Sequence, residues 1–273
     1  MMQFLSRRME VKSILKNSGK KFSLQTSGKV AEIGYNFLYL VMEFFVDKGS
    51  IVRKIWGKSD TVLFVFAGAS AEFALNKAVD WLYFTGRLPA DPLGRLFSTV
   101  MYAREIVFSK KEKAEQAIDK ITLIHQTVEN NRGAQIPDWA YRDVLFMLIH
   151  YSLASFELLE RKLTDDEKEE LFDVFYRMGL RMGLKGLPAN YHEWIAMRNQ
   201  HLHNDLVKSD YSIDLYNQYR KHLGSIRYKL LTESQKLVAP AHVKALLGLG
   251  KISWITPLLI LYKLSRKIKM DGY

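Results

Sequence analysis

The chain has 273 residues and a formal net charge of +11, with 48% hydrophobic and 12% aromatic residues. This composition is typical of a folded protein with a sizeable core and excludes an intrinsically disordered chain. Cysteine is absent, which excludes disulfides, thiolate metal sites, iron–sulfur clusters and a cysteine nucleophile. Six prolines and sixteen glycines are few for a barrel or sandwich of many short strands.

Positive charge is concentrated at the two ends of the chain. Residues 1–29 contain seven Lys or Arg against one Glu, and residues 251–273 contain five against one Asp. The region between them is nearly neutral. A nucleic-acid-binding protein usually spreads basic side chains over a folded face, so we expect no nucleic-acid partner. The charged ends have two interpretations: adhesion to an anionic membrane surface, or tails that keep the protein soluble.

Charge-free stretches are too short to span a bilayer. The longest cover residues 61–71, 144–156 and 252–262, all below the roughly 18–20 residues that a transmembrane helix needs. The N-terminus lacks the apolar core of a secretory signal. We therefore expect a cytoplasmic protein with peripheral membrane association. Residues 251–273 fit an interfacial helix, because Trp254, Leu258 and Leu261 precede several basic residues; the alternative is that they pack against the domain.

Helical periodicity dominates the first half of the chain. Residues 61–74 are rich in small side chains, which allow a neighbouring element to approach closely. Asp91-Pro92 predicts a helix start, since Asp caps free N–H groups and Pro fits the first turn. An apolar stripe follows to residue 107. A second stripe at 113–130 predicts another helix, which ends near Gly133.

The second half continues the same pattern. A helix is predicted from Pro137 to about Leu159; it is apolar nearly all round, which indicates a central position. Thr164 and Glu167 form a capping box for the next helix. Further helices are expected at 191–204, 213–223 and 225–237. We predict one all-α domain over residues 30–250, with a basic arm at 1–29 and a basic amphipathic segment at 251–273.

The histidines supply the candidate ligands. His192, His201 and His203 lie close in sequence, but residues two apart on a helix point about 200° apart, so surface histidines are favoured over a metal triad. His150 is interpreted as a core histidine that hydrogen-bonds a carbonyl. His125 occupies an apolar position of its stripe, which is consistent with a satisfied core residue or with an axial haem ligand.

The stretch from residue 56 to about 224 resembles the catalytic domain shared by latex-clearing rubber oxygenases and endoplasmic-reticulum-bound MpaB-type oxygenases. The resemblance rests on Asp-Pro-Leu-Gly-Arg-Leu-Phe-Ser-Thr at 91–99, Ile-His-Gln-Thr-Val at 124–128 and the apolar helix at 139–160. It implies an all-α fold around a buried haem b, with His125 as the proximal iron ligand. Arg95 and Thr99 match the paired polar residues of the family's haem-facing helix.

In this family, O₂ is used to cleave a carbon–carbon double bond of an isoprenoid. The resemblance thus implies a haem-b-dependent oxygenase for an apolar substrate, in which Arg95 and Thr99 are catalytic and share one helix face by their spacing of four. Rubber-cleaving members carry a lysine where this chain has Ser98, and a Gln-x-Ala-x-Pro-like signature where it reads Glu-Phe-Ala-Leu-Asn at 72–76. Both differences argue against rubber as the substrate.

Two alternatives stay open at this point. One is a haem-binding protein without oxygenase chemistry, since the residues on the open side of the iron decide between the two. The other is a cofactor-free helical interaction module in which His125 and Arg95 are structural. An absorption spectrum of the purified protein separates the last class from the first two.

Overall fold

The computed structural model describes residues 43–86 and 90–270. The described residues from position 44 onwards form one compact unit, and the arm predicted at 1–29 lies outside the described residues. Within the described ranges the regular elements are all helices, accompanied by two isolated bridges, Phe44–Lys110 and Asn76–Leu206. The predicted all-α class is therefore confirmed.

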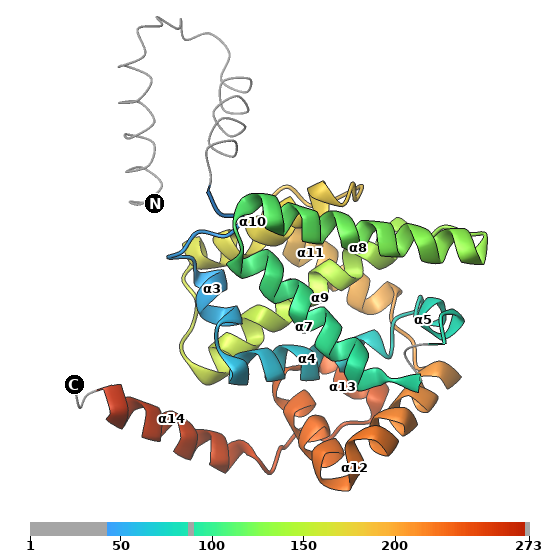
Figure 1. Cartoon of the computed structure of the whole chain (residues 1–273). Helices are drawn as coiled ribbons and strands as arrows, with labels where there is room; N and C mark the ends of the chain where they lie inside the picture. The colour runs from blue at the N-terminus through green and yellow to red at the C-terminus, as the bar shows by residue number, and fades with distance from the viewer. Residues whose placement is uncertain (1–42, 87–89, 271–273) are drawn as a thin grey trace, which may run out of the picture. The chain divides into compact units, whose positions relative to one another are not determined.

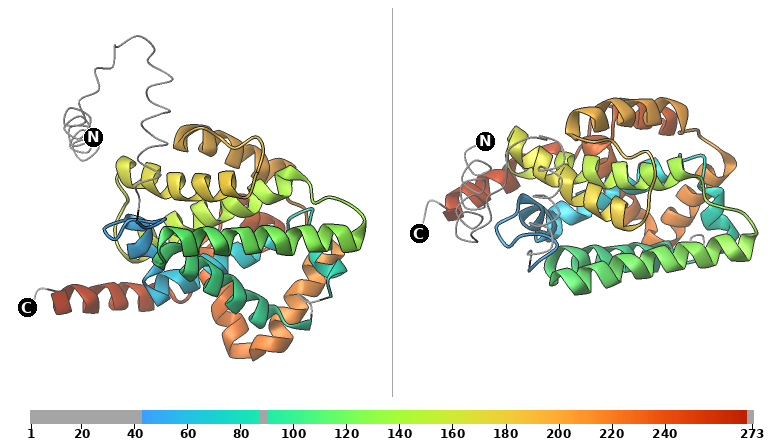
Figure 2. Two further views of the ribbon diagram at one scale, coloured as in Figure 1. Left: turned by 45° about the horizontal axis from the view of Figure 1, so that its top comes forward. Right: turned by 90° about the horizontal axis from the view of Figure 1, so that it is seen from above.

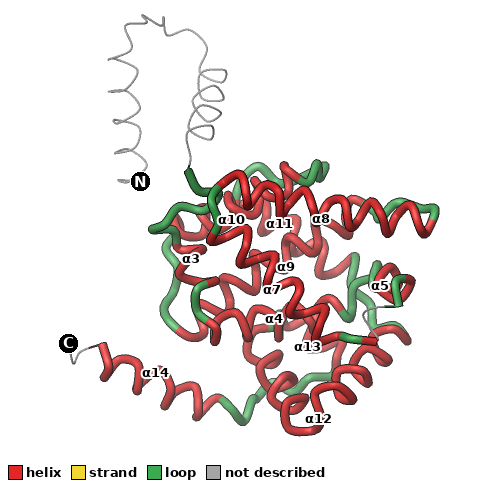
Figure 3. Tube along the Cα trace, in the orientation of Figure 1, coloured by secondary structure: helices red, strands yellow, loops and turns green. Residues whose placement is uncertain are grey.

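The described helices follow one another along the chain with short connections (Figures 1 and 3). They are α3 (Ile51–Trp56), α4 (Ser59–Phe73), α5 (Asp80–Phe84), α7 (Pro92–Phe108), α8 (Lys111–Arg132), α9 (Asp138–Leu159), α10 (Asp165–Arg181), α11 (Tyr191–Asn204), α12 (Asp210–Val238), α13 (Ala241–Leu247) and α14 (Thr256–Met270).

Helices α4 and α9 make the most extensive helix–helix contact and carry much of the core. Viewed from above, α7 and α8 lie on one side of α9 and α11 lies on the other (Figure 2). The small residues of α4 permit the close approach that the sequence predicts: a Cβ added to Gly68 would overlap the ring of Tyr151 on α9. Tyr151 is fully buried there.

Local signals set the helix ends as predicted. The Asp91 carboxylate accepts a hydrogen bond of 2.8 Å from the Gly94 N–H at the start of α7, and Thr164 with Glu167 forms the capping box of α10. Gly133 ends α8 in the left-handed conformation, with φ of 67°. Gly224, with φ of 70°, interrupts α12 between the two helices predicted there.

Helix α14 projects from the body (Figure 1), is tied to it by a few contacts and is otherwise largely exposed. The Tyr262 hydroxyl donates to Asp60 at 2.6 Å, the Lys263 ammonium donates to the Leu158 carbonyl at 2.9 Å, and Ile255 is buried. Leu258 and Leu261 are 56% and 63% exposed. The alternative that these leucines pack against the domain is therefore wrong. None of the described helices combines the length and hydropathy that a membrane crossing requires.

Candidate functional site

His125 lies on the side of α8 that faces the start of α9. Its imidazole is half-buried, and its ring centre lies 5.1 Å from that of Tyr141 in an edge-to-face arrangement. The Tyr141 hydroxyl donates to Oε1 of Glu129 at 3.0 Å, and burial raises the pKa of Tyr141. His125 is thus held against an aromatic ring that is itself fixed by a carboxylate.

A pocket of about 140 Å³ opens beside His125. Its walls include Thr122, Gln126, Glu129, Asp138 and Leu184, so it is more polar than the apolar stripe of the sequence predicts. The reason is that α8 continues beyond the packed body (Figure 1), and its later turns meet solvent on several sides; Leu123 is 61% exposed.

Thr99 lines a different space. It borders an apolar pocket of about 70 Å³ whose walls include Trp56, Tyr102, Ile121 and Phe175. Helix α7 ends and α8 begins at the same turn, from which the two helices diverge (Figure 1). Thr99 and His125 line separate pockets. Arg95 belongs to α7, and its side chain lies outside the described residues.

His125 has the chemistry of an axial haem ligand, because its imidazole lines a pocket. The size of that pocket is smaller than the roughly 300–1,000 Å³ of ordinary ligand sites. The residues present therefore supply one candidate ligand at a small, partly polar pocket.

His150 is the core histidine that the sequence predicts. It hydrogen-bonds the backbone of Val238 on α12, and burial lowers its pKa to about 4. A neutral imidazole therefore stands inside the helix packing, with Arg198 nearby as a second cause of the low pKa. This leaves His125 as the better candidate for a ligand at a pocket.

A buried ionic cluster lies on the opposite side of α9. Glu72 of α4 is fully buried and receives both terminal guanidinium nitrogens of Arg198 from α11, together with the Tyr151 hydroxyl at 2.9 Å. Nε2 of His201 lies 3.2 Å from Oε1 of Glu72. Nδ1 of the same ring lies 2.6 Å from Asp143 of α9.

The pKa values of the charged groups in this cluster depend on one another. Burial raises the pKa of Glu72, but Arg198 and His201 outweigh burial and hold it at about 2. Burial lowers the pKa of His201, yet its hydrogen bonds to Asp143 and Glu72 outweigh that effect and raise it to about 9. At neutral pH and without another bound cation, Glu72 is thus a carboxylate and His201 an imidazolium.

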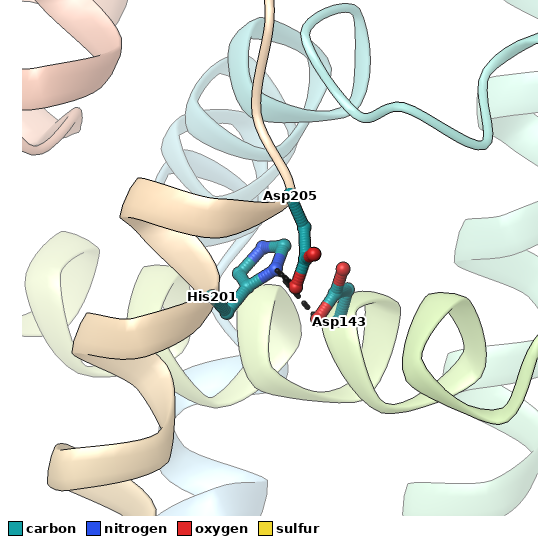
Figure 4. Close-up of side chains that lie close together, drawn as sticks. All are labelled: Asp143, His201 and Asp205. Atoms are coloured by element: carbon teal, nitrogen blue, oxygen red, sulfur yellow. Dashed lines mark hydrogen bonds and ion pairs between the residues drawn. The ribbon is translucent and has the colours of Figure 1, made fainter.

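Asp205 completes the cluster at the C-cap of α11, four residues after His201 (Figure 4). Its Oδ2 lies 3.2 Å from Nδ1 of His201. The expectation of surface histidines holds for His192 and His203, which are exposed, but it is wrong for His201, which is 4% exposed. The cause is tertiary: the chain after α11 pairs with the end of α4 through the Asn76–Leu206 bridge.

Sequence reasoning missed this cluster because its members lie on three helices far apart in the chain. One local signal was available, the spacing of four between His201 and Asp205, which places both on one helix face. Glu72 gives a second signal, since it is the one acidic residue in the apolar and small-residue run at 61–74.

The comparisons with known proteins give one family. The family model described as the catalytic domain of ER-bound oxygenase mpaB/B′ and rubber oxygenase matches residues 54–261. This range includes α4, α7, α8, α9 and α11, and hence both the His125 pocket and the buried ionic cluster. Neither a curated protein nor a solved structure shows a significant match to the chain.

Proposed function

Because the chain belongs to the MpaB and rubber oxygenase catalytic-domain family, we propose that it is a haem-b-dependent oxygenase that oxidises an apolar, isoprenoid-like substrate with O₂. Oxygenases of this kind belong to the oxidoreductases and act with a metal or haem cofactor. The observation that carries the proposal is His125, the motif histidine, standing at a pocket between α8 and α9.

His125 is the proposed axial ligand. Its edge-to-face contact with Tyr141 restricts the ring orientation, and a fixed ring presents its nitrogen lone pair in one direction. Haem b, when bound, supplies a redox-active iron with which an oxygenase activates O₂. The protein's own contribution is to hold the imidazole in a fixed orientation at the pocket.

Thr99 and Arg95 are the proposed polar partners from α7. Thr99 borders the apolar pocket, whose aromatic and aliphatic walls exclude water and suit a hydrocarbon. Arg95 lies one helical turn before Thr99 on α7, and the family motif is the basis for proposing that it acts together with Thr99. A hydroxyl and a guanidinium there would supply hydrogen-bond donors beside an otherwise apolar space.

Haem retention tests the proposal. Full-length protein, purified and incubated with haemin, is expected to develop a Soret band, and His125→Ala is expected to lose it. His150→Ala is the matched control, because His150 lies inside the helix packing, away from the pocket, and hydrogen-bonds Val238. We expect it to retain the band, with lower thermal stability.

The outcomes separate the three function classes. Protein that takes up no haemin is a cofactor-free module, and the proposal fails. Haem uptake that survives in His125→Ala would show that His125 is not the iron ligand. Haem uptake without O₂ consumption in the presence of a soluble isoprenoid alkene indicates a haem protein of another kind.

The exposed face of α14 supports peripheral contact with an anionic membrane. Glu233 holds the start of this segment, because its side chain accepts a hydrogen bond of 3.1 Å from the Trp254 N–H. Leu258 and Leu261 then face outward, and the segment carries five basic residues. An apolar face beside positive charge is typical of an interfacial helix, and such a surface lies where apolar substrates dissolve.

Co-sedimentation with anionic vesicles tests this contact. The double variant Leu258→Ser, Leu261→Ser is expected to bind more weakly than the unaltered chain at low salt. Substituting Leu123, which is equally exposed on α8, by Ser serves as the control. Equal partitioning of all three proteins would show that the C-terminal segment does not contact membranes.

A further inference from the structure

Three potential ligand atoms of the buried ionic cluster converge on one point (Figure 4). Nδ1 of His201 lies 2.6 Å from Oδ1 of Asp143 and 3.2 Å from Oδ2 of Asp205, and all three atoms lie within 4.8 Å of one another. Ligands of a tetrahedral first-row cation stand about 3.4 Å apart when the bonds are about 2.1 Å long. The three side chains are therefore close to the positions that a metal ion requires.

The backbone fixes this convergence. Asp143 comes from α9, His201 from the last turn of α11, and Asp205 from the C-cap of α11. The chain beyond α11 is held against the end of α4 by two hydrogen bonds, from Lys77 N–H to the Asp205 carbonyl at 2.9 Å and from Val207 N–H to the Leu75 carbonyl at 2.8 Å. The ligand positions thus depend on backbone pairing and not on side-chain flexibility.

The second nitrogen of His201 is held by a further carboxylate. Nε2 faces Oε1 of Glu72 at 3.2 Å, and Glu72 is itself fixed by Arg198 and by the Tyr151 hydroxyl. A metal-ligating histidine almost always donates its other N–H to such a carboxylate, which sets the tautomer and leaves the remaining nitrogen for the metal. This arrangement is independent of the two aspartates.

A metal cation at Nδ1 of His201 would contact both neighbouring carboxylates, whereas a proton on Nδ1 cannot. An N–H at Nδ1 points at one acceptor, whereas two carboxylates approach Nδ1. The other oxygen of Asp143 accepts from the Asn76 amide at 3.2 Å. Asp205 therefore shares the single N–H at Nδ1 of His201 with Asp143, a sharing that a cation bonded to all three atoms removes.

The charges of the cluster also favour a bound cation. Glu72, Asp143 and Asp205 are three carboxylates, and Arg198 supplies one permanent positive charge within the cluster. With a neutral His201 the group carries two net negative charges, which one divalent cation neutralises. Buried charge is costly unless it is compensated in this way.

We propose that Asp143, His201 and Asp205 bind one Zn²⁺ ion that joins α9 to the end of α11. Mixed imidazole and carboxylate ligands suit zinc better than magnesium, which prefers oxygen alone and keeps its waters. Binding replaces the proton between the imidazole and the aspartates. The Asp205 side chain is 25% exposed while the other two are 3–4% exposed, so the ion enters past Asp205.

Calorimetric titration of full-length, EDTA-treated protein with ZnCl₂ tests the site. One Zn²⁺ per chain and a higher melting temperature are expected, with no effect of MgCl₂ at the same concentration. Asp205→Asn removes a ligand at the partly exposed position with little change of shape. We expect it to weaken Zn²⁺ binding at least tenfold, while circular dichroism shows that the fold is kept.

His203→Ala is the matched control. His203 is exposed and stacks near His242, with ring centres 4.9 Å apart, so this pair is the competing zinc-binding surface. Binding that survives Asp205→Asn and disappears in His203→Ala overturns the proposal, as does the absence of Zn²⁺ uptake by the unaltered chain. His125→Ala is expected to bind Zn²⁺ normally, which keeps this result separate from haem retention.

Discussion

Tyr141 and Asp143 stand two residues apart on α9 and belong to regions of opposite character. Tyr141 contacts His125 at a partly polar, half-open pocket. Asp143 meets His201 in a cluster from which solvent is nearly excluded. A helix turns about 200° over two residues, so α9 separates the two regions. The His125 pocket is an open cavity, whereas the ionic cluster consists of charges in direct contact, with a place for no more than the single cation proposed above.

The difference indicates separate tasks. Groups that pair fully with one another stabilise a fold, because removing one leaves the others buried and uncompensated. Groups at a pocket contribute less to folding and are available for binding. We therefore expect substitutions in the ionic cluster to affect stability, and substitutions at His125 to affect ligand retention.

The largest effect is expected from Arg198→Met. It leaves the Glu72 carboxylate buried without its guanidinium partner, and the loss of one member of such a pair costs about 3–5 kcal/mol. Urea denaturation measures the free energy of unfolding. The control is Arg181→Met on α10, which removes an ion pair with Asp119 that is largely exposed and is expected to cost about 1 kcal/mol or less. Equal losses would contradict the division between the regions.

The helices themselves were predictable from sequence. Capping residues such as Asp91 and Thr164 act within one turn, and Gly133 and Gly224 supply the left-handed backbone that ends or interrupts a helix. These are local effects, so spacing along the chain is enough to find them. The central position of α9 followed from its apolar residues on all sides for the same reason.

The ionic cluster could not be predicted in this way. Glu72 and Arg198 are 126 positions apart, and each taken alone looks like an ordinary charged residue of an amphipathic helix. Their pairing depends on how α4, α9 and α11 pack, which periodicity does not specify. The separation of Thr99 from His125 has a related cause, because spacing within α7 does not reveal that α7 and α8 diverge.

The pH dependence of stability gives the second prediction, for protein in EDTA. The pKa of Glu72 is lowered from 4.5 to about 2 on folding, so its contribution is present above pH 4.5 and is lost as the pH falls towards 2. The pKa of His201 is raised from 6.5 to about 9. Its contribution is present below pH 6.5 and is lost as the pH rises to 9.

Urea midpoints measured from pH 3 to pH 10 are therefore expected to be highest between about pH 4.5 and 6.5. His201→Gln should flatten the alkaline side of this profile, and His125→Ala should leave that side unchanged. A midpoint in the unaltered chain that stays constant from pH 6.5 to 9 would show that His201 is not held as an imidazolium.

The smallest effect on stability is expected from Tyr141→Phe, and it makes the comparison across α9 most direct. The substitution removes the hydrogen bond to Glu129 and keeps the ring against His125, so about 0.5–1.5 kcal/mol is lost. Because the freed carboxylate and the ring lie at the His125 pocket, haemin uptake is expected to weaken, with Zn²⁺ binding unchanged.

Asp143→Asn, on the other side of the same helix, is expected to give the reverse: Zn²⁺ binding falls and the Soret band stays. If both variants altered both readouts, α9 would couple the two regions instead of separating them.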